Sequence, residues 1–377
     1  MMEKTLPEVC IIQYGFPFDS SKFCSAEGVP LVRIRDVVRG YSETYTTEIA
    51  GENYIVNDGD LLIGMDGEFN IAYWKGGRAY LNQRVCRLIP REDVDRDYIF
   101  YYMPQALKAI EDATPFVTVK HLSAKQLSKI LIPLPDMSEQ QRISAVLRSV
   151  DRVIAMRKKE LDELNNLVKS RFIELFGMPG TDAFGWGLVP LGSTCNINPK
   201  KSLDSRLVSG AMVSFVPMPA VTEHGEIDAT AIKEYDEVKT GFTYFAENDV
   251  LFAKITPCME NGKGAVAKGL HNGIGFGSTE FHVLRPISGK TDPYWIYTLT
   301  AFSQFRMDAA SNMTGSAGQR RVPASFLENY RVSLPPIALQ EQFAAFVEQT
   351  DKSKLAVQKG LQELEILKKS LMQQYFG

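Results

Sequence analysis

An ungapped internal repeat is the feature of this sequence that most constrains its fold. Residues 128–177 correspond to residues 328–377 at a constant offset of 200, and fourteen of the fifty aligned positions are identical. Chance would produce only a few identities, so the unit is duplicated. A chain that repeats one unit but varies the sequence between the copies predicts two related modules held at a set separation. The identical pairs are Leu134/Leu334, Pro135/Pro335, Gln140/Gln340, Ala145/Ala345, Asp151/Asp351, Lys159/Lys359, Leu161/Leu361, Glu163/Glu363, Leu164/Leu364, Leu167/Leu367, Lys169/Lys369, Ser170/Ser370, Phe176/Phe376 and Gly177/Gly377.

Each copy of the repeat predicts a short strand, a proline turn and one long helix. The extended segments Ile130–Pro135 and Tyr330–Pro336 end at prolines, and proline disfavours helix in the residue before it. In the first copy, Ser138–Gln141 has the spacing of a capping box, which predicts that the helix starts there. The second copy has Ala338 at the equivalent position, so its start is less well specified.

Apolar residues in both predicted helices recur at alternating steps of four and three. This spacing over five heptads indicates a coiled-coil seam. Gly177 and Gly377 follow the last periodic residues, where a C-cap glycine is expected. The seam comprises Ile143, Leu147, Val150, Ile154, Leu161, Leu164, Val168 and Leu175 in the first helix, and Phe343, Val347, Val357, Leu361, Leu364, Leu371 and Tyr375 in the second.

The two seams are interrupted at different places, which bears on what each helix packs against. Arg157 and Arg171 interrupt the first seam where the second has Val357 and Leu371. Either each helix packs on its neighbouring module, or the two helices pair with each other. We favour pairing, because neither helix has a good seam for a homodimer. A helix of this length spans roughly 58 Å, so antiparallel pairing would place the modules at opposite ends of a rigid spacer.

Composition sets broader bounds on the class of protein. A chain of 377 residues is long enough for two or more domains, each able to bury a core. No apolar run approaches the length of a membrane span. The segment Met1–Pro7 lacks the apolar centre of a signal peptide, so we expect a cytoplasmic protein. The five cysteines form no Cys-x-x-Cys pair, which favours a reducing compartment and argues against a zinc site.

The charge balance does not favour nucleic-acid binding by charge alone. The net charge is −3, and residues 1–135 carry 15 basic and 18 acidic side chains. Residues 178–335 carry 14 and 15. Proteins that bind nucleic acid through charge usually have a basic excess. Any such function must therefore depend on local patches or on partner proteins.

The segments between the helices also correspond, although more faintly. Asp58–Met65 resembles Glu247–Lys254, each with a polar turn that leads into a buried strand. Asn82–Pro90 matches Ser278–Pro286 in strand character and in its closing proline. Helical runs follow near residues 96–111 and 292–310. The predicted fold class is therefore α+β, with two α+β modules in tandem, each followed by one long helix. The predicted divisions are residues 1–135, 136–177, 178–335 and 336–377.

Catalytic and metal-binding signatures are incomplete in this sequence. Ser288–Thr291 ends like a phosphate-binding loop, but Leu284 stands where the first glycine is required. Thr314–Gly318 resembles a nucleophile elbow, but its first residue is threonine. The four histidines share no ligand-like spacing. We assign no catalytic residue and no metal ligand, and expect a binding protein.

Candidate binding residues lie in two loops of the second module. Arginine and lysine can bind guanine edges or phosphates, asparagine and glutamine can bind adenine, and glycine allows close approach of the backbone. Any one of these residues is at least as often part of a solvated charged loop. The candidates are Lys254, Thr256, Asn261 and Lys263 in the loop 253–264, and Gln319, Arg320 and Arg321 in the loop 314–321.

The first module offers a smaller set of candidates. Lys120 and His121 stand where Arg320 and Arg321 stand at the 200-residue offset. This correspondence favours a binding surface in both modules. The further candidates are Arg33 and Arg35, expected to alternate on one strand face, and Lys75 and Arg78, in a basic turn.

With these residues in view, the chain resembles the DNA sequence-specificity subunits of type I restriction-modification systems over essentially its full length. Leu134–Gln141 and Leu334–Gln342 are similar to the starts of that family's two helical regions. The first module departs from the family by starting at Thr5–Cys10 without a tryptophan, which Trp186–Gly192 supplies in the second. The other similar stretches are Asp249–Lys263, Gly277–Phe281 and Thr314–Pro323, which resemble its target-recognition domains.

The resemblance implies that each module recognises one half of a split DNA site in the major groove. The paired helices would fix the gap between the halves at about one helical turn, roughly 34 Å. They would also bind two modification subunits, which carry S-adenosylmethionine and methylate an adenine that leaves the base stack. Restriction subunits could join this complex, and this chain would hold no cofactor itself. The alternative is a scaffold that binds proteins or small ligands, which the near-neutral charge favours; a nuclease is poorly supported.

Overall fold

The computed structural model describes residues 2–114, 120–201, 204–316 and 318–377, which form two compact units. Unit 1 contains residues 1–156 together with 361–377, and unit 2 contains residues 157–360. Each unit combines a strand-rich module with parts of both long helices, α5 (Met137–Phe176) and α10 (Ile337–Phe376). The α+β class predicted from the sequence is therefore confirmed.

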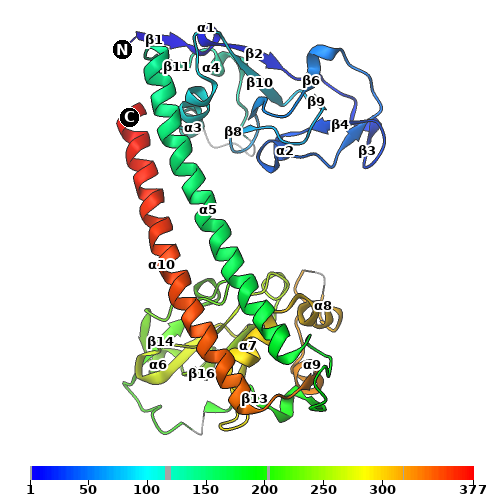
Figure 1. Ribbon diagram of the computed structural model, residues 1–377, viewed down its shortest axis with the longest axis vertical. Helices are drawn as coiled ribbons and strands as arrows, with labels where there is room; N and C mark the ends of the chain where they lie inside the picture. The colour runs from blue at the N-terminus through cyan, green and yellow to red at the C-terminus, as the bar shows by residue number, and fades with distance from the viewer. Residues whose placement is uncertain (1, 115–119, 202–203, 317) are drawn as a thin grey trace. The chain divides into compact units, whose positions relative to one another are not determined.

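The described residues of unit 1 form three antiparallel or mixed sheets. In the first, β1 pairs with β11, so the start of the chain lies beside the strand that leads into α5 (Figure 1). The second has the order β2-β10-β7-β8, and the third has the order β3-β5-β4-β9-β6. The strands are β1 (Met2–Thr5), β2 (Cys10–Tyr14), β3 (Phe23–Cys24), β4 (Val29–Val32), β5 (Tyr45–Thr46), β6 (Ile55–Val56), β7 (Leu61–Gly64), β8 (Asn70–Tyr73), β9 (Ala79–Leu81), β10 (Val85–Pro90) and β11 (Leu131–Leu134).

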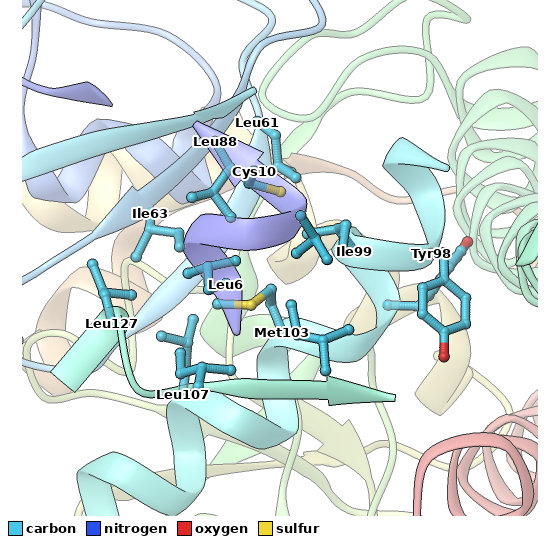
Figure 2. Close-up of a cluster of buried hydrophobic side chains, with 14 of the residues drawn as sticks. Leu6, Cys10, Leu61, Ile63, Leu88, Tyr98, Ile99, Met103, Leu107 and Leu127 are labelled. Atoms are coloured by element: carbon cyan, nitrogen blue, oxygen red, sulfur yellow. The ribbon is translucent and has the colours of Figure 1, made fainter. Parts of the chain in front are cut away.

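The main core of unit 1 lies between the β2-β10-β7-β8 sheet and the helix α3 (Arg96–Ala113). Leu6, Ile63 and Met103 come from three different elements and meet in it (Figure 2). Ile143 and Leu147 of α5 complete the cluster from another side. The shorter helices of the unit are α1 (Leu6–Val9), α2 (Ile34–Arg39) and α4 (Ala124–Leu127).

Unit 2 repeats this arrangement of strands. β12 pairs with β21 as β1 pairs with β11, and the order β13-β20-β17-β18 matches β2-β10-β7-β8. The third sheet has the order β15-β14-β19-β16, and its central pair β14–β19 is parallel, as is β4–β9. The strands are β12 (Leu188–Pro190), β13 (Cys195–Ile197), β14 (Met212–Val216), β15 (Ile232–Glu234), β16 (Thr243–Ala246), β17 (Val250–Ala253), β18 (Gly264–Val266), β19 (Ile274–Gly277), β20 (Phe281–Pro286) and β21 (Arg331–Ser333).

The helices of unit 2 pack an aromatic-rich core against the β13-β20-β17-β18 sheet. Trp295, Phe252, Phe305 and Phe343 are almost completely buried in it. The helical run predicted near 292–310 is two helices that meet at Phe302. The helices are α6 (Tyr235–Val238), α7 (Pro293–Ala301), α8 (Ser303–Ser311) and α9 (Ala324–Asn329).

The start of α5 differs from the sequence prediction. Asp136 caps the helix, because its Oδ1 accepts from the Glu139 amide at 2.9 Å and from the Ser138 hydroxyl at 2.6 Å. The predicted capping box over Ser138–Gln141 is therefore wrong, since Ser138 already lies inside the helix. At the other end Gly177 has a φ of +78° and donates to the Ile173 carbonyl at 2.9 Å, which confirms the predicted C-cap.

The structure gives a reason for one identical pair of the repeat, Gln140 and Gln340. Gln140 and Gln340 are buried one turn into α5 and α10. Each amide oxygen accepts from the N-cap residue of another helix, Asp95 of α3 at 2.9 Å and Asp292 of α7 at 3.0 Å. Each amide nitrogen donates to the proline carbonyl five residues earlier, at 2.9 Å. Each glutamine therefore hydrogen-bonds the start of its own long helix to the adjoining module.

Within unit 1, the two long helices run antiparallel. Arg142 of α5 lies over the Tyr375 ring, and further along α5 Asp151 pairs with Lys368 at 2.6 Å. Leu371 packs against the same core as Ile143, so module packing and helix packing occur together.

Within unit 2, the last part of α5 packs against the first part of α10. Phe172 and Phe176 of α5 both contact Phe343. Val347 and Val357 of α10 are buried, as predicted for seam residues. The remaining predicted pairing residues are half-buried, namely Leu161 and Leu164 in unit 2 and Ile154, Leu361 and Leu364 in unit 1. Among the described residues, none of the helices combines the length and apolar character needed to cross a membrane.

Candidate nucleic-acid interface

The structure brings together the two candidate loops of the second module. The loop that follows β17 and the loop that precedes α9 are joined through their backbones. The Thr256 amide donates to the Arg320 carbonyl at 3.0 Å, and the Val322 amide donates to the Lys254 carbonyl at 2.9 Å. Residues predicted separately from the sequence therefore form one surface cluster, which contains Lys254, Thr256, Arg320 and Arg321.

Arg321 is the most firmly held cation of this cluster. Its Nε and Nη2 donate to the Glu280 carboxylate at 2.9 and 2.8 Å, and its Nη1 donates to the Gln319 carbonyl at 3.1 Å. The Arg321 guanidinium lowers the pKa of the Glu280 carboxyl below its usual value. The side chain of Arg321 remains 41% exposed, so it is both paired and accessible.

The other members of the cluster are held more loosely. Arg320 approaches Glu260 at 3.9 Å, and the Thr256 hydroxyl donates to the same carboxylate at 2.9 Å. Lys254 is half-buried, and burial lowers the pKa of its ammonium group. The three cations Lys254, Arg320 and Arg321 and the two carboxylates Glu260 and Glu280 give the cluster a single net positive charge.

Two predicted residues of the first loop lie apart from this cluster. Lys263 is mostly buried and approaches Glu223 at 3.8 Å. Asn261 is exposed and lines a neighbouring cavity of about 480 Å³. The structure therefore divides the loop, and only its first part belongs with Arg320 and Arg321.

Arg306 on α8 hydrogen-bonds the loop 253–264 from its buried side. It was not among the residues predicted from the sequence. The side chain is 6% exposed. It donates to the backbone carbonyls of Met259, Gly262 and Lys263 at 3.1 to 3.5 Å. It also donates to the Thr300 carbonyl and lies over the Phe252 ring. Burial lowers the pKa of its guanidinium to about 10.

A buried histidine supports the second loop. His282 donates from Nε2 to the Val322 carbonyl at 2.8 Å, directly after Arg321. Its Nδ1 contacts the Asn198 amide at 3.0 Å, and Asn198 in turn accepts from the Val283 amide. Burial lowers the pKa of His282, so the neutral imidazole is favoured.

The first module has the same backbone arrangement at Lys120 and His121. The Gly67 amide donates to the Lys120 carbonyl at 2.9 Å, and the Leu122 amide donates to the Met65 carbonyl at 2.7 Å. These bonds repeat those of Thr256 and Val322 in the second module. The equivalence of Lys120–His121 with Arg320–Arg321 is therefore confirmed.

The side chains at this position of the first module also have acidic or carbonyl partners. His121 Nδ1 lies 2.7 Å from Asp66 Oδ1, and Arg84 approaches the same carboxylate at 3.5 Å. Lys120 donates to the Glu111 carbonyl at 2.6 Å. Arg84 was not predicted from the sequence, because its proximity to Asp66 depends on strand pairing.

The prediction that Arg33 and Arg35 alternate on one strand face is wrong. The strand β4 ends at Val32, Arg33 is the N-cap residue of α2, and Arg35 lies within that helix. The Asp36 carboxylate accepts from the Arg33 amide at 2.9 Å, which stabilises the start of α2 and ends the strand.

The remaining two candidates lie in the turn between β8 and β9. Arg78 pairs with Glu52 at 2.8 Å, and Lys75 is exposed. Within the part of the chain that the structure describes, no hydrogen bond or ion pair joins either side chain to Lys120 or His121.

Comparison with known proteins gives a consistent result. The model of the family described as type I restriction modification DNA specificity domain matches residues 1–166 and again residues 185–366. The specificity subunit of the Escherichia coli type I restriction enzyme EcoEI is 43% identical over 153 residues, which is 40% of this chain and 25% of that protein. The EcoBI specificity subunit of E. coli is 40% identical over 167 residues, 44% of this chain and 35% of that protein. The chain thus matches only about a quarter to a third of the length of these relatives.

Solved structures support the same fold over nearly the whole chain. The type I restriction-modification S subunit from M. genitalium has a TM-score of 0.54 at 13% identity, covering 98% of this chain and 94% of that one. A chain from a study of type I R-M complex assembly and conformational transition has a TM-score of 0.53 at 18% identity, covering all of this chain and 97% of that one. Because the family model matches two long segments that together make up most of the sequence, this chain belongs to the type I restriction-modification DNA specificity family and carries its domain twice.

Proposed function

We propose that this chain is the non-catalytic DNA-recognition subunit of a type I restriction-modification complex. Each module binds one half of a split double-stranded site. The observation that carries the proposal is the pair of hydrogen-bonding side chains found at one structural position in both modules, Lys120–His121 and Arg320–Arg321, each held by equivalent backbone hydrogen bonds. Equivalent placement with different side chains is what two modules need to recognise two different half-sites.

The proposal divides the chain into working parts. Residues 1–135 and 178–335 are the two target-recognition domains, and residues 136–177 and 336–377 are the helical spacers. The spacers pair as an antiparallel coiled coil, set the gap between the half-sites and bind two modification subunits. The net charge of −3 supports a role for these partners, because they would supply the positive charge that this chain lacks.

The chemistry then belongs to the partner subunits. They bind S-adenosylmethionine and methylate an adenine that has left the base stack. This chain positions the DNA in the cytoplasm and holds no cofactor of its own. A restriction subunit can join the same complex.

The decisive experiment is co-expression of the chain with its genomic neighbours, followed by pull-down and adenine-methylation sequencing of the host DNA. We expect a stable complex with a methyltransferase and a split methylated motif that disappears when this gene is deleted. No methyltransferase partner and unchanged methylation would instead favour the scaffold function.

Two variant pairs test whether recognition is modular. K120A/H121A should relax or abolish recognition of one half of the motif, and K254A/R320A should do so for the other half. Equal loss at both halves from either pair would contradict independent recognition by the two modules.

A further inference from the structure

The guanidinium of Arg321 is held in one orientation while part of its hydrogen-bonding capacity remains open. A guanidinium carries five N–H donors. Two of them bind the Glu280 carboxylate, and one binds the Gln319 carbonyl. Among the described residues, one donor on each terminal nitrogen is left for a ligand.

The backbone that carries Arg321 is also tightly held. Its amide donates to the Thr314 carbonyl at 2.8 Å, and its carbonyl accepts from the Thr314 amide at 3.0 Å. Gly315 has a φ of +120°, and a Cβ there would lie 2.9 Å from the Gln319 carbonyl oxygen. Glycine at this position therefore allows the tight loop that places this carbonyl against the guanidinium.

Arg321 differs from the two neighbouring cations, Arg320 and Lys254, in how firmly its side chain is oriented. Among the described residues, the Arg320 guanidinium has one long contact of 3.9 Å, with Glu260, so its orientation is weakly defined. Lys254 is half-buried, and its ammonium is a point charge without a planar donor pair. Only Arg321 combines a fixed plane, open donors and exposure among these three cations.

We propose that Arg321 recognises a guanine in the half-site bound by the second module, and that Glu280 is the positioning residue that aims it. Guanine presents N7 and O6 as adjacent acceptors in the major groove, and an arginine with two donors is their commonest specific partner. Ordering the side chain before DNA binds also reduces the entropy cost of the contact. The inference rests on the proposed function. It adds the nucleobase that is recognised, guanine, and the carboxylate that orients the arginine, that of Glu280.

A phosphate contact is the competing role for Arg321. Phosphate binding needs the positive charge but not its orientation, and it affects all DNA sequences equally. A carboxylate as close as that of Glu280 would weaken such a contact. The two roles therefore differ in their dependence on the base and on Glu280.

The test uses the complete complex with its modification subunits and the split site found by methylation sequencing. Each guanine of the site is replaced in turn by 7-deazaguanine, which lacks the N7 acceptor. DNA affinity is measured for the wild type, R321K and R321A. For one guanine, in one half-site, we expect the replacement to weaken wild-type binding about tenfold and to have no further effect on R321A, because the variant has already lost the N7 contact.

Three results would overturn the inference while leaving the proposed function intact. The first is a site in which no guanine shows this coupling. The second is a guanine replacement that weakens wild type and R321A equally. The third is an R321A variant that binds all sequences more weakly to the same extent, with a salt slope reduced by about 1. Absence of any split motif would instead contradict the proposed function itself.

Glu280→Gln tests the positioning role separately. We expect E280Q to lower discrimination for that guanine while binding to non-specific DNA is unchanged or tighter, because the carboxylate no longer orients or neutralises the arginine. Glu237→Gln is the matched control, since it makes the same charge change at an exposed position of the same module. An E280Q variant that keeps full discrimination, or an equal effect of E237Q, would remove Glu280 from this role.

Discussion

His282 shows how a single buried side chain supports a loop that carries candidate binding residues. It is 6% exposed and hydrogen-bonded on both ring nitrogens, to Val322 and to Asn198. Lys254 and Glu280 are the charged groups whose fields act on it. Because burial is the main cause of its lowered pKa, protonation would place a charge where water cannot solvate it.

This arrangement predicts a loss of stability in acid. Above the unfolded-state pKa of about 6.5, His282 is neutral in both states and the structure has its full stability. As the pH falls below that value, the unfolded chain takes up a proton before the folded chain does, so the free energy of unfolding decreases. Urea unfolding of H282Q between pH 4 and 8 should show a smaller decrease than the wild type. H224Q, at an exposed histidine, is the control, and an identical pH profile for H282Q and wild type would contradict the prediction.

Arg306 is a second residue whose role is visible only in three dimensions. Its guanidinium donates to the carbonyls of Met259 and Gly262 in the loop after β17 and to the Thr300 carbonyl of α7. Replacement by methionine would keep much of the volume but remove the donors that reach these buried carbonyls, of which that of Met259 would keep, among the described residues, only the Gly262 amide. We expect R306M to reduce the free energy of unfolding by about 2–4 kcal/mol.

Thermal or urea unfolding measures this loss. Gln304→Ala on the same helix α8, at an exposed position, is the control and should change stability by less than about 0.5 kcal/mol. A loss in R306M no larger than in this control would show that the loop does not depend on Arg306.

At the scale of elements, the repeated glutamines connect each long helix to a neighbouring helix. Gln140 joins α5 to the N-cap of α3, and Gln340 joins α10 to the N-cap of α7. The same two contacts recur in both copies, so the identity of this pair has a structural cause. The acceptor and donor of one side chain each satisfy a backbone group near a helix start.

Replacing each glutamine by alanine should therefore destabilise one unit and not the other. We expect about 1–3 kcal/mol of destabilisation from each, because a buried amide and a buried carbonyl lose their partners. Hydrogen exchange should increase at the start of α3 in Q140A and at the start of α7 in Q340A. Each variant is the control for the other, and faster exchange in both units from one substitution would contradict local fastening.

At the scale of the whole molecule, the proposed spacer function depends on the length of both long helices. Inserting seven residues after Met156 in α5 and seven before Leu361 in α10 keeps the heptad register and lengthens each helix by about 10.5 Å. If the helices set the gap, the methylated motif should gain about three base pairs between its halves.

Methylation sequencing of cells that carry the double insertion measures the gap. An insertion in only one helix is the control, and it should reduce methylation because the two seams no longer match. A double-insertion variant that methylates a motif with the original gap would contradict the spacer function.

The sequence by itself determined the duplication, the α+β character of both modules, the two long helices and their glycine ends. These features follow from local patterns, since apolar periodicity and the special backbone preferences of proline and glycine act over a few residues. The resemblance to the family was recognised from the same local stretches of sequence. The constant offset of 200 residues also identified Lys120–His121 as the counterpart of Arg320–Arg321.

Only the tertiary structure decided which groups meet. Arg321 and Glu280 are 41 residues apart, and Arg306 reaches carbonyls more than 40 residues earlier. Such contacts depend on strand pairing and helix packing, which no short window of sequence contains. Even the helix cap at Asp136, and the helix at Arg35, depend on which side chain accepts from a backbone amide, Asp136 from Glu139 and Asp36 from Arg33.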